Sequence, residues 1–385
     1  MALVSDQIVR LFRDRFSPTS EIAVYRAPGR VNLIGEHTDY NLGFVFPIAL
    51  GMACYVAAAP ANHREVRVYS RDIDETFSIG VDQIASAEPS RKWSDYVLGV
   101  ANQLVAAGIA IEPCDVYIMS EVPAGSGLSS SAALEIASAL AFLGDRSLNP
   151  LKLAQLGQRA ESQFVGMPCG IMDQYASVFG KRGDAIQIDC RELVHEYVDL
   201  PPDVRIIAVN SMVKHELGTS AYRERVAECR EAVAAIQESA PKVESLRDVS
   251  LALFGSLQDS IPATPRRRAR HIVSENERVL DLAAAARRND LKEMGRLFVA
   301  SHRSMQYDYE ISCEEIDFLV DTAIKLPGVY GSRMTGGGFG GCTVNLLAPD
   351  AVEEFRSTLS ASYAERYSIQ PMFYDCEPAA GAGRI

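Results

Sequence analysis

Residues 123–133, Pro-Ala-Gly-Ser-Gly-Leu-Ser-Ser-Ser-Ala-Ala, have the composition of a backbone cradle for phosphate. Glycine lets the main chain approach an anion closely, and a helix-forming run at 132–143 follows directly. The free amide groups and the dipole of a helix N-terminus stabilise negative charge. This glycine-serine loop is not the usual P-loop, which ends in Gly-Lys-Ser/Thr. Taken alone, it also fits a Gly/Ser turn that caps an ordinary helix.

A polar turn near the N-terminus brings Glu36, His37 and Asp39 within four residues, directly after an apolar strand and Gly35. Carboxylates and an imidazole offer acceptors and a donor that could hold several hydroxyls of a polyol at once. Taken alone, the segment is more simply a polar turn at the surface.

A second glycine cluster, Met-Thr-Gly-Gly-Gly-Phe-Gly-Gly at 334–341, formally contains Gly-x-Gly-x-x-Gly. The dinucleotide fingerprint must open a helix, whereas residues 342–347 are strand-like, so we reject a Rossmann interpretation. Because ordering so many glycines costs backbone entropy, we expect another backbone or a ligand to approach closely here. A close crossing of two strands without a ligand is the alternative.

Composition limits the classes of function. The chain has 385 residues, of which 48% are hydrophobic, enough for one large or two medium domains. A net charge of -12 disfavours nucleic acid and anionic membranes as partners, but not a small anionic substrate. The eight cysteines stand singly, without Cys-x-x-Cys, so we expect free thiols and no structural zinc. With no apolar signal segment at the N-terminus, we expect a cytoplasmic protein.

The two halves of the chain differ in their predicted secondary structure. In the first half we expect strands near 23–27, 66–70, 115–120, 185–189 and 196–198 and helices near 94–107, 131–143 and 151–164. The uncharged run 44–61 is interrupted by prolines and a glycine, so it fits a pair of buried strands better than a membrane helix.

After a strand near 204, the second half favours long charged helices near 223–238, 276–288 and 291–305. Pro201 and Pro202 mark the natural boundary, which gives predicted domains at 1–203 and 204–385. The basic run 266–271 precedes more charged residues in what looks like one amphipathic helix, and we interpret it as a solvated helix face, not a nucleic-acid site.

Together these motifs resemble the galactokinases, a branch of the GHMP small-molecule kinase family. The matching segments are 26–50 (a galactokinase-specific motif), 123–133 (the ATP loop of the family), 169–174, 213–222 and 333–344 (its third motif). The ATP loop is common to the superfamily, whereas Gly-Glu-His-Thr-Asp-Tyr is specific to the galactokinase branch. The resemblance covers essentially the whole chain, and Leu42 is a minor departure where the family more often has a small residue.

The fold that the resemblance implies is α+β: the two-domain GHMP kinase fold with its active site between the domains. Its N-terminal domain resembles domain 2 of ribosomal protein S5, and its C-terminal domain is α/β. We allow for the last strand packing back on the N-terminal domain.

The resemblance also implies the catalytic residues. Asp173 would accept the proton of the C1 hydroxyl of the sugar as that oxygen attacks the γ-phosphorus of ATP. Arg30 would keep this carboxylate ionised and offset charge on the transferring phosphoryl group. Mg²⁺ would take Ser131 and Glu161 as protein ligands. The residues alone would favour a first-turn helix acid for Asp173 and a solvated side chain for Glu161.

The binding residues follow in the same way. The resemblance assigns the sugar to Glu36, His37, Thr38, Asp39, Gly170 and Tyr222, with His37 as a hydrogen-bond donor and not a base. It assigns ATP to Ser70, Gly125, Ser126, Gly127, Leu128, Ser129, Ser130 and Ser131, with an adenine slot that could include Trp93 and Tyr96.

The implied function is ATP-dependent phosphorylation of galactose to α-D-galactose 1-phosphate, at the entry to galactose catabolism (the Leloir pathway). The alternatives are a kinase of N-acetylgalactosamine or arabinose on the same scaffold and a non-catalytic sensor of galactose and ATP. Such sensors lose residues from the serine run of the ATP loop, which is intact here at 129–131. The sequence does not define the oligomeric state, and we favour a monomer.

Overall fold

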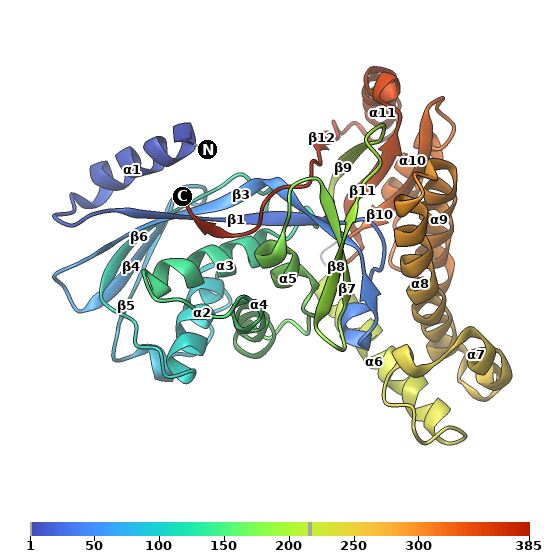
Figure 1. Cartoon of the computed structure of the whole chain (residues 1–385), viewed down its shortest axis with the longest axis horizontal. Helices are drawn as coiled ribbons and strands as arrows, with labels where there is room; N and C mark the ends of the chain where they lie inside the picture. The colour runs from blue at the N-terminus through green and yellow to red at the C-terminus, as the bar shows by residue number, and fades with distance from the viewer. Residues whose placement is uncertain (1, 215–217) are drawn as a thin grey trace.

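The computed structural model describes residues 2–214 and 218–385. The described strands form three sheets, of six, four and three strands. The six-stranded sheet occupies one end of an elongated molecule and the long helices of the second half occupy the other (Figure 1). Mixed strands and helices of this kind confirm the expected α+β class.

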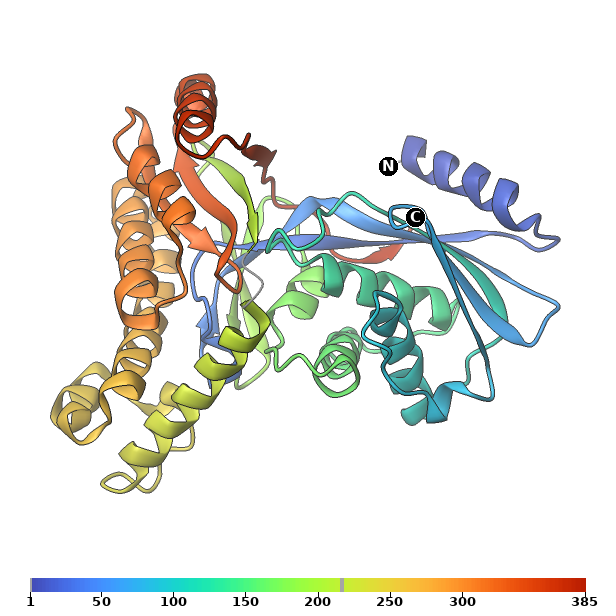
Figure 2. The ribbon, with the colours of Figure 1, turned by 180° about the vertical axis from the view of Figure 1, so that it is seen from behind.

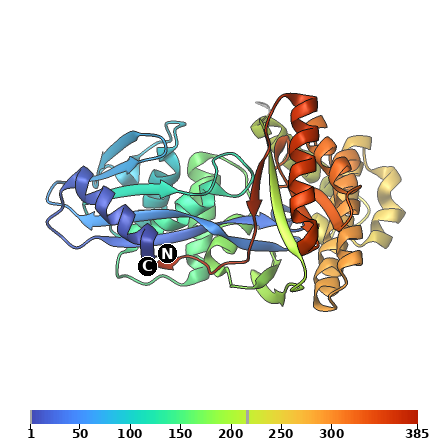
Figure 3. The ribbon, with the colours of Figure 1, turned by 90° about the horizontal axis from the view of Figure 1, so that it is seen from above.

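The six-stranded sheet has the order β13-β1-β3-β6-β4-β5. Its strands are β1 (Ala23–Asn32), β3 (Pro47–Pro60), β4 (Glu65–Ser70), β5 (Glu75–Gly80), β6 (Cys114–Ser120) and β13 (Gly383–Arg384). All neighbours are antiparallel except β4 and β6, which are parallel. Because β13 pairs with β1, the C-terminus returns to the sheet where the chain begins, and the two ends lie close together (Figure 3).

This sheet is covered on both faces at β3, which explains why residues 44–61 carry no charge. On β3, Tyr55 and Ala57 pack under helix α1 (Ala2–Phe16), whereas Cys54 and Val56 belong to the main core. Successive side chains of a strand point to opposite faces, so covering both faces requires apolar residues throughout. Figure 2 shows α1 alone on one side and α2 (Ser94–Ala106) and α3 (Ser130–Leu143) on the other. In the part of the chain that the structure describes, no helix has the length and apolar character to span a bilayer.

The expected strand pair at 44–61 is confirmed, and it divides at Phe46. The short β2 (Phe44–Val45) pairs with β7 (Asp184–Asp189) in the three-stranded sheet, which β8 (Val194–Asp199) completes. The rest of the run continues as β3. The chain segment that carries the polar turn is therefore fixed between two sheets.

The four-stranded sheet has the order β10-β11-β9-β12. Its strands are β9 (Arg205–Lys214), β10 (Val329–Thr335), β11 (Gly340–Leu347) and β12 (Met372–Asp375). Helices α10 (Glu314–Ala323) and α11 (Val352–Tyr367) cover one face, where Ile207 and Val209 meet Leu319 and Phe355. Helix α9 (Leu291–Ser304) packs on β10. The other helices are α4 (Pro150–Arg159), α5 (Met172–Phe179), α6 (Gly218–Gln237), α7 (Leu251–Leu257) and α8 (Ala263–Arg287).

The proposed domain boundary at 203/204 falls between β8 and β9. The main apolar core crosses it, because Ile136 from α3 and Leu297 from α9 belong to the same buried cluster. The division into 1–203 and 204–385 therefore stays a prediction.

The expected helix at 151–164 is confirmed, but its last turn is π-helical. Helix α4 ends at Arg159, and a single π-helical turn, Ala160–Val165, follows. Phe164 and the Ala160 carbonyl press against Gly99 of α2, where a Cβ would meet the Phe164 ring at 3.1 Å. A π turn shifts the facing of the residues after it and is frequent at functional sites. Here the turn contains Glu161, which is buried.

The expectation that 266–271 is a solvated face holds for Arg270, which is exposed, but is wrong for Arg268 and His271. Arg268 and His271 are buried on α8, and Arg268 pairs with Glu228 and Glu310, both at 2.7 Å. The more exposed Arg267 pairs with Glu310 as well. A guanidinium is taken out of water only when carboxylates satisfy it, so the run is basic because it holds α6 and the segment after α9 against α8.

Candidate active site

A cavity of about 160 Å³ lies where the polar turn, α5, α6 and the second glycine cluster meet. It is lined by Arg30, Glu36, His37, Asp39, Glu161, Met167, Cys169, Gly170, Met172, Asp173, Tyr222, Gly336 and Gly337. Residues that the sequence analysis predicted for catalysis, for the metal and for the sugar come from distant parts of the chain. Most of them line this one cavity.

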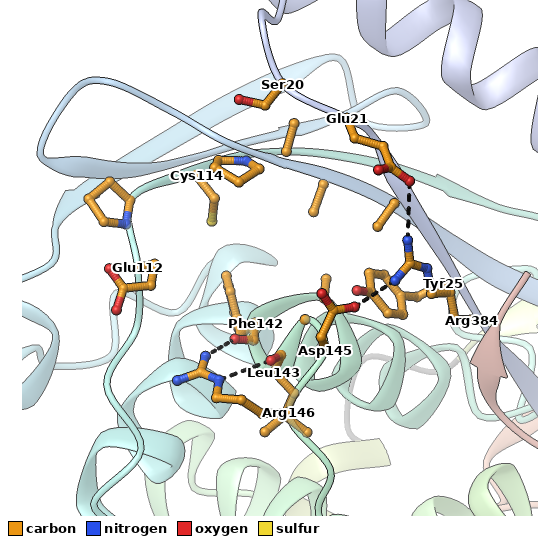
Figure 4. Close-up of a pocket in the computed structure, with 17 residues that line it drawn as sticks. Ser20, Glu21, Tyr25, Glu112, Cys114, Phe142, Leu143, Asp145, Arg146 and Arg384 are labelled. Atoms are coloured by element: carbon orange, nitrogen blue, oxygen red, sulfur yellow. Dashed lines mark hydrogen bonds and ion pairs between the residues drawn. The ribbon is translucent and has the colours of Figure 1, made fainter.

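A larger cavity of about 590 Å³ lies elsewhere, against β1 and the end of α3 (Figure 4). Its two arginines are already paired within the chain: Arg384 bonds Asp145 and approaches Glu21, and Arg146 donates to the Phe142 and Leu143 carbonyls. None of the predicted site residues lines this larger cavity, so we place the site in the smaller one.

Arg30 and Asp173 form the charged centre of the small cavity. Arg30 Nε and Nη2 donate to Asp173 Oδ1 at 2.9 and 2.8 Å, and Ser129 Oγ donates to Oδ2 at 2.5 Å. The Asp173 side chain remains 26% exposed against 5% for Arg30, so one side of the carboxylate is open to a substrate. Asp173 lies in the first turn of α5 without capping it. The bond from Ser129 was missed by the sequence analysis, which assigned that serine to ATP.

The glycine-serine loop leads into α3 through Ser129, which has a left-handed backbone with φ of 60°. Gly125 and Gly127 also have positive φ, a conformation that favours glycine. No side chain caps α3, because the hydroxyl of Ser129 is directed to Asp173 instead. The first amide groups of α3 are therefore available to an anion, as the sequence predicts.

The second glycine cluster crosses directly over this loop. A Cβ on Gly336 would lie 3.1 Å from Gly127 Cα, and one on Gly341 would lie 3.0 Å from Ser126 O. The expectation that another backbone approaches closely is confirmed, and the strand β11 that follows the cluster excludes the Rossmann interpretation.

Two buried carboxylates lie beside the cavity. Gln174 Nε2 donates to Glu161 Oε2 at 2.7 Å and to Glu135 Oε2 at 2.8 Å, and the Ser131 side chain also bonds Glu161. Burial, together with the charge of Asp173, raises the pKa of Glu161 to about 7. Burial raises the pKa of Glu135 well above its usual range. The sequence analysis missed Glu135, although a lone charge in the apolar run 130–143 was a usable signal.

These groups fit a hard divalent cation. A hydroxyl and a carboxylate are oxygen ligands of the type that Mg²⁺ prefers, and Glu135 Oε1 is buried without a hydrogen-bond partner. Among the residues that the structure describes, no cluster of three or more His, Cys, Asp or Glu could hold a metal by itself. The donor set thus suits an ion that also takes phosphate oxygens.

Asp39 and Gly170 form one wall of the cavity. A Cβ on Gly170 would overlap the carboxylate of Asp39, so only glycine fits there. Burial and the neighbouring charge of Asp173 raise the pKa of Asp39 to about 6. Tyr222 of α6 faces the same space, with its ring 5.0 Å from that of His37. Residues 215–217 of the matching segment that ends at Tyr222 lie outside the described residues.

Glu36 lines the cavity, but both of its carboxylate oxygens already accept hydrogen bonds from other residues of the chain. Its Oε2 pairs with Arg333, and its Oε1 accepts from Thr335 Oγ1 and from Gly336 N, both at 3.1 Å. Burial raises the pKa of Glu36, and Arg333 opposes that shift. The carboxylate ties the polar turn to the second glycine cluster, and Arg333 had no assigned role in the sequence analysis.

Thr38 does not line the cavity, contrary to its assignment to the sugar. It is fully buried, and its hydroxyl lies 2.8 Å from the Gly35 carbonyl and 2.5 Å from the Phe44 carbonyl. A hydroxyl that closes the turn in this way is not free for a substrate.

The predicted adenine residues do not gather in the cavity. Trp93 Nε1 donates to Glu75 at 2.8 Å, and Ser70 is buried at the end of β4. Burial and the charges of Glu161 and Glu135 raise the pKa of Tyr96 to about 12, so Tyr96 lies near these two carboxylates. The adenine slot stays a prediction.

A carboxylate with one open side lies beside an uncapped helix N-terminus and beside oxygen groups that suit a hard cation. This arrangement is typical of a small-molecule kinase. Family models for the GHMP kinases match residues 95–181 (N-terminal domain) and 282–365 (C-terminal). The galactokinase galactose-binding signature matches residues 10–60. The chain belongs to the galactokinase family, as the resemblance predicted.

The chain is similar to known galactokinases over nearly its full length. A galactokinase of Roseiflexus sp. (strain RS-1) is 46% identical over 97% of this chain and 96% of its own, and one of Chloroflexus aurantiacus is 47% identical over 96% and 94%. The structure of Lactococcus lactis galactokinase complexed with galactose superposes with a TM-score of 0.94 at 36% identity, with both chains fully covered. Methanococcus jannaschii mevalonate kinase, at 17% identity and a TM-score of 0.67, shares the fold.

Proposed function

We propose that this sugar kinase transfers the γ-phosphoryl group of ATP to the C1 hydroxyl of D-galactose, giving α-D-galactose 1-phosphate and ADP. The observation that carries the proposal is the position of Asp173. Its carboxylate faces the cavity that holds the polar turn and, through Ser129, contacts the loop at the N-terminus of α3. An acceptor hydroxyl and a phosphate can therefore meet at one carboxylate.

Asp173 acts as the proton acceptor. A carboxylate fixed on both oxygens by Arg30 and Ser129 takes the hydroxyl proton as the sugar oxygen attacks phosphorus. Phosphoryl transfer through a loose transition state depends more on position and charge than on base strength. Arg30 supplies both, because it orients Asp173 and places positive charge beside the transferring group.

Mg²⁺ is the cofactor that we propose, with Ser131 and Glu161 as its protein ligands. When bound it would screen the negative charge of the phosphates of ATP. Glu161 binds it as a carboxylate, so its proton must leave first, and the raised pKa makes that loss depend on pH near neutrality.

Asp39, Tyr222 and His37 select the sugar. A pocket built to hydrogen-bond particular hydroxyls rejects an epimer strongly, because the wrong sugar leaves buried polar groups unpaired. Glu36, in contrast, supports the pocket by holding the polar turn against the second glycine cluster.

We also propose that the protein acts in the cytoplasm as a monomer. Eight free thiols are typical of a reducing compartment. The residues that we assign to catalysis and to the sugar at this cavity belong to one chain, as a monomeric enzyme requires.

The test is ATP consumption with galactose, glucose, talose, N-acetylgalactosamine and arabinose, for the wild type and for Asp173→Asn. We expect clear preference for galactose and a loss of roughly 100-fold or more in kcat for the variant, with galactose still bound. Preference for another sugar would overturn the substrate, and near-normal turnover by Asp173→Asn would overturn the base.

A further inference from the structure

His37 begins a chain of buried hydrogen bonds that leads away from the cavity. Its Nδ1 lies 2.8 Å from the Tyr40 hydroxyl, which lies 2.7 Å from the Tyr309 hydroxyl. The Tyr309 oxygen in turn lies 3.1 Å from Cys229 Sγ. The chain connects the polar turn to the segment after α9 and to α6. None of its members beyond His37 is needed by the proposed reaction.

The other ring nitrogen of His37 reveals where the proton lies. Nε2 is 3.3 Å from the Gly337 carbonyl, and a carbonyl oxygen can only accept a hydrogen bond. An unprotonated Nε2 would place its lone pair against a lone pair of the carbonyl oxygen, so Nε2 carries the proton. Burial, reinforced by the charges of His271 and Arg225, lowers the pKa of His37 to about 3, so the ring is neutral.

The direction of every other bond in the chain follows. In the neutral Nε2–H tautomer, Nδ1 is an acceptor and must receive the Tyr40 O–H. The Tyr40 oxygen then accepts from Tyr309, whose own oxygen accepts from the Cys229 thiol. Each group donates its single proton once, and the chain is fully satisfied.

The ring of His37 is also fixed in space. Its centroid lies 4.9 Å from that of Tyr309 and 5.0 Å from that of Tyr222, and Tyr40 packs edge-on at 88°. A rotated ring would lose both the Tyr40 bond and these contacts. The Nε2–H group therefore stays directed along the cavity wall that Gly337 forms.

We propose that Tyr40, supported by Tyr309, is a positioning residue that fixes the ring of His37 through its bond to Nδ1. The Nε2–H group then faces the cavity, where its long bond to the Gly337 carbonyl, at 3.3 Å, can be shared with a sugar hydroxyl. The proposal rests on the proposed function, because it needs a polyol in the cavity. Without the Tyr40 hydroxyl the buried Nδ1 loses its donor, and the ring is no longer held in the orientation that directs Nε2–H into the cavity. The Gly337 carbonyl still favours the Nε2–H tautomer. Tyr40 thus contributes to substrate binding through His37.

The first readout requires no substrate. In full-length protein with ¹⁵N-labelled histidine at pH 7, long-range proton–nitrogen spectra distinguish a protonated from a bare ring nitrogen, and His37→Gln identifies the signal. We expect the neutral Nε2–H form in the wild type, and in Tyr40→Phe the same form with a changed Nδ1 chemical shift, because the bare nitrogen has lost its hydrogen bond. A wild-type ring protonated on Nδ1, or on both nitrogens, would overturn the proposal.

The second readout is kinetic. We expect Tyr40→Phe to raise the KM for galactose about tenfold while kcat changes less than about twofold, since a buried acceptor loses its donor but Asp173 is untouched. Tyr309→Phe keeps the donor to Nδ1 and should show a smaller rise in KM with the Nε2–H form retained. It also provides a second variant if Tyr40→Phe folds poorly.

The matched control is Tyr363→Phe, which removes another buried tyrosine hydroxyl, one that donates to the Ser211 carbonyl at 2.9 Å on α11. Its KM should equal that of the wild type. An unchanged Nδ1 chemical shift and an unchanged KM in Tyr40→Phe would overturn the positioning role. A wild type that fails to phosphorylate galactose would overturn the proposed function, whereas the tautomer spectrum would still test the hydrogen-bond chain.

Discussion

The guanidinium of Arg333 is fully buried against the carboxylate of Glu36, 297 residues away in sequence. Arg333 Nη1 also donates to the Leu33 carbonyl at 2.8 Å, and Glu275 lies 3.6 Å from Nη2. This pair joins the polar turn to the second glycine cluster, the two segments that face each other across the cavity. The shape of the proposed sugar site thus depends on one buried ion pair.

Arg333→Leu tests that dependence. It leaves Glu36 and Glu275 without their shared cation, and breaking a buried pair on one side costs about 3–5 kcal/mol of unfolding free energy. Urea unfolding measures the loss. Arg366→Leu, which breaks an exposed pair with Glu314, is the control and should cost less than about 1 kcal/mol. Equal effects of the two variants would show that the buried pair does not fix the site.

Glu161 should make stability depend on pH. Its folded pKa of about 7 lies above the unfolded value, so the folded state binds the proton more tightly and stability falls as pH rises from about 4.5 to 7. Glu161→Gln, which stays neutral, should lose much of this slope and be more stable than the wild type at pH 8 by about 1–3 kcal/mol. Denaturant titrations without Mg²⁺ at pH 5 and pH 8 measure the difference. A parallel slope in the variant would contradict the burial argument.

Glu161→Ala tests the metal role separately. We expect it to lose Mg²⁺-dependent turnover while still binding galactose, because Asp39, Tyr222 and His37 are unchanged. Calorimetric titration with galactose and an activity series in Mg²⁺ give the two readouts. Turnover that keeps the wild-type Mg²⁺ dependence would exclude Glu161 as a ligand.

Ser129→Ala removes the donor to Asp173 Oδ2. The carboxylate would then rotate more freely about its contact with Arg30, and we expect kcat to fall roughly tenfold, equivalent to about 1.4 kcal/mol, with little change in the KM for galactose. Ser360→Ala removes an exposed hydrogen bond to Gln370 on α11 and should behave as the wild type. If the KM for ATP alone changes, Ser129 contacts the nucleotide and does not position Asp173.

Leu42 has a left-handed backbone, with φ of 59°, and its side chain is exposed. A side chain other than glycine pays about 1–2 kcal/mol for this conformation, so only glycine would relieve the strain. Leu42→Gly should therefore raise the unfolding free energy by about 1 kcal/mol, whereas Leu42→Ala should not, because alanine keeps the strain. Urea midpoints of the two variants make the comparison.

The local parts of the site could be predicted from sequence. The loop at 123–133, the turn after Gly35 and the strand after the second glycine cluster follow from neighbouring residues, because glycine conformation and helix start signals are local. The function followed from the motifs together, since none of them alone excluded a simple structural role.

The rest depends on packing between distant segments. No spacing rule pairs Arg333 with Glu36, and none directs Ser129 toward Asp173 and away from the N-cap of its own helix. The π turn that contains Glu161 packs Phe164 against Gly99, a contact between segments 65 residues apart. The sequence indicated which residues could take part in the chemistry. Packing between distant segments decided which of these residues hold other site residues in position.

The product itself tests the central claim most directly. Purified protein incubated with ATP, Mg²⁺ and galactose should give one new phosphorus resonance, that of α-galactose 1-phosphate, in equal amount to ADP, and Asp173→Asn should give almost none. ADP formation without a sugar phosphate, phosphate on another hydroxyl, or an active Asp173→Asn variant would contradict the account.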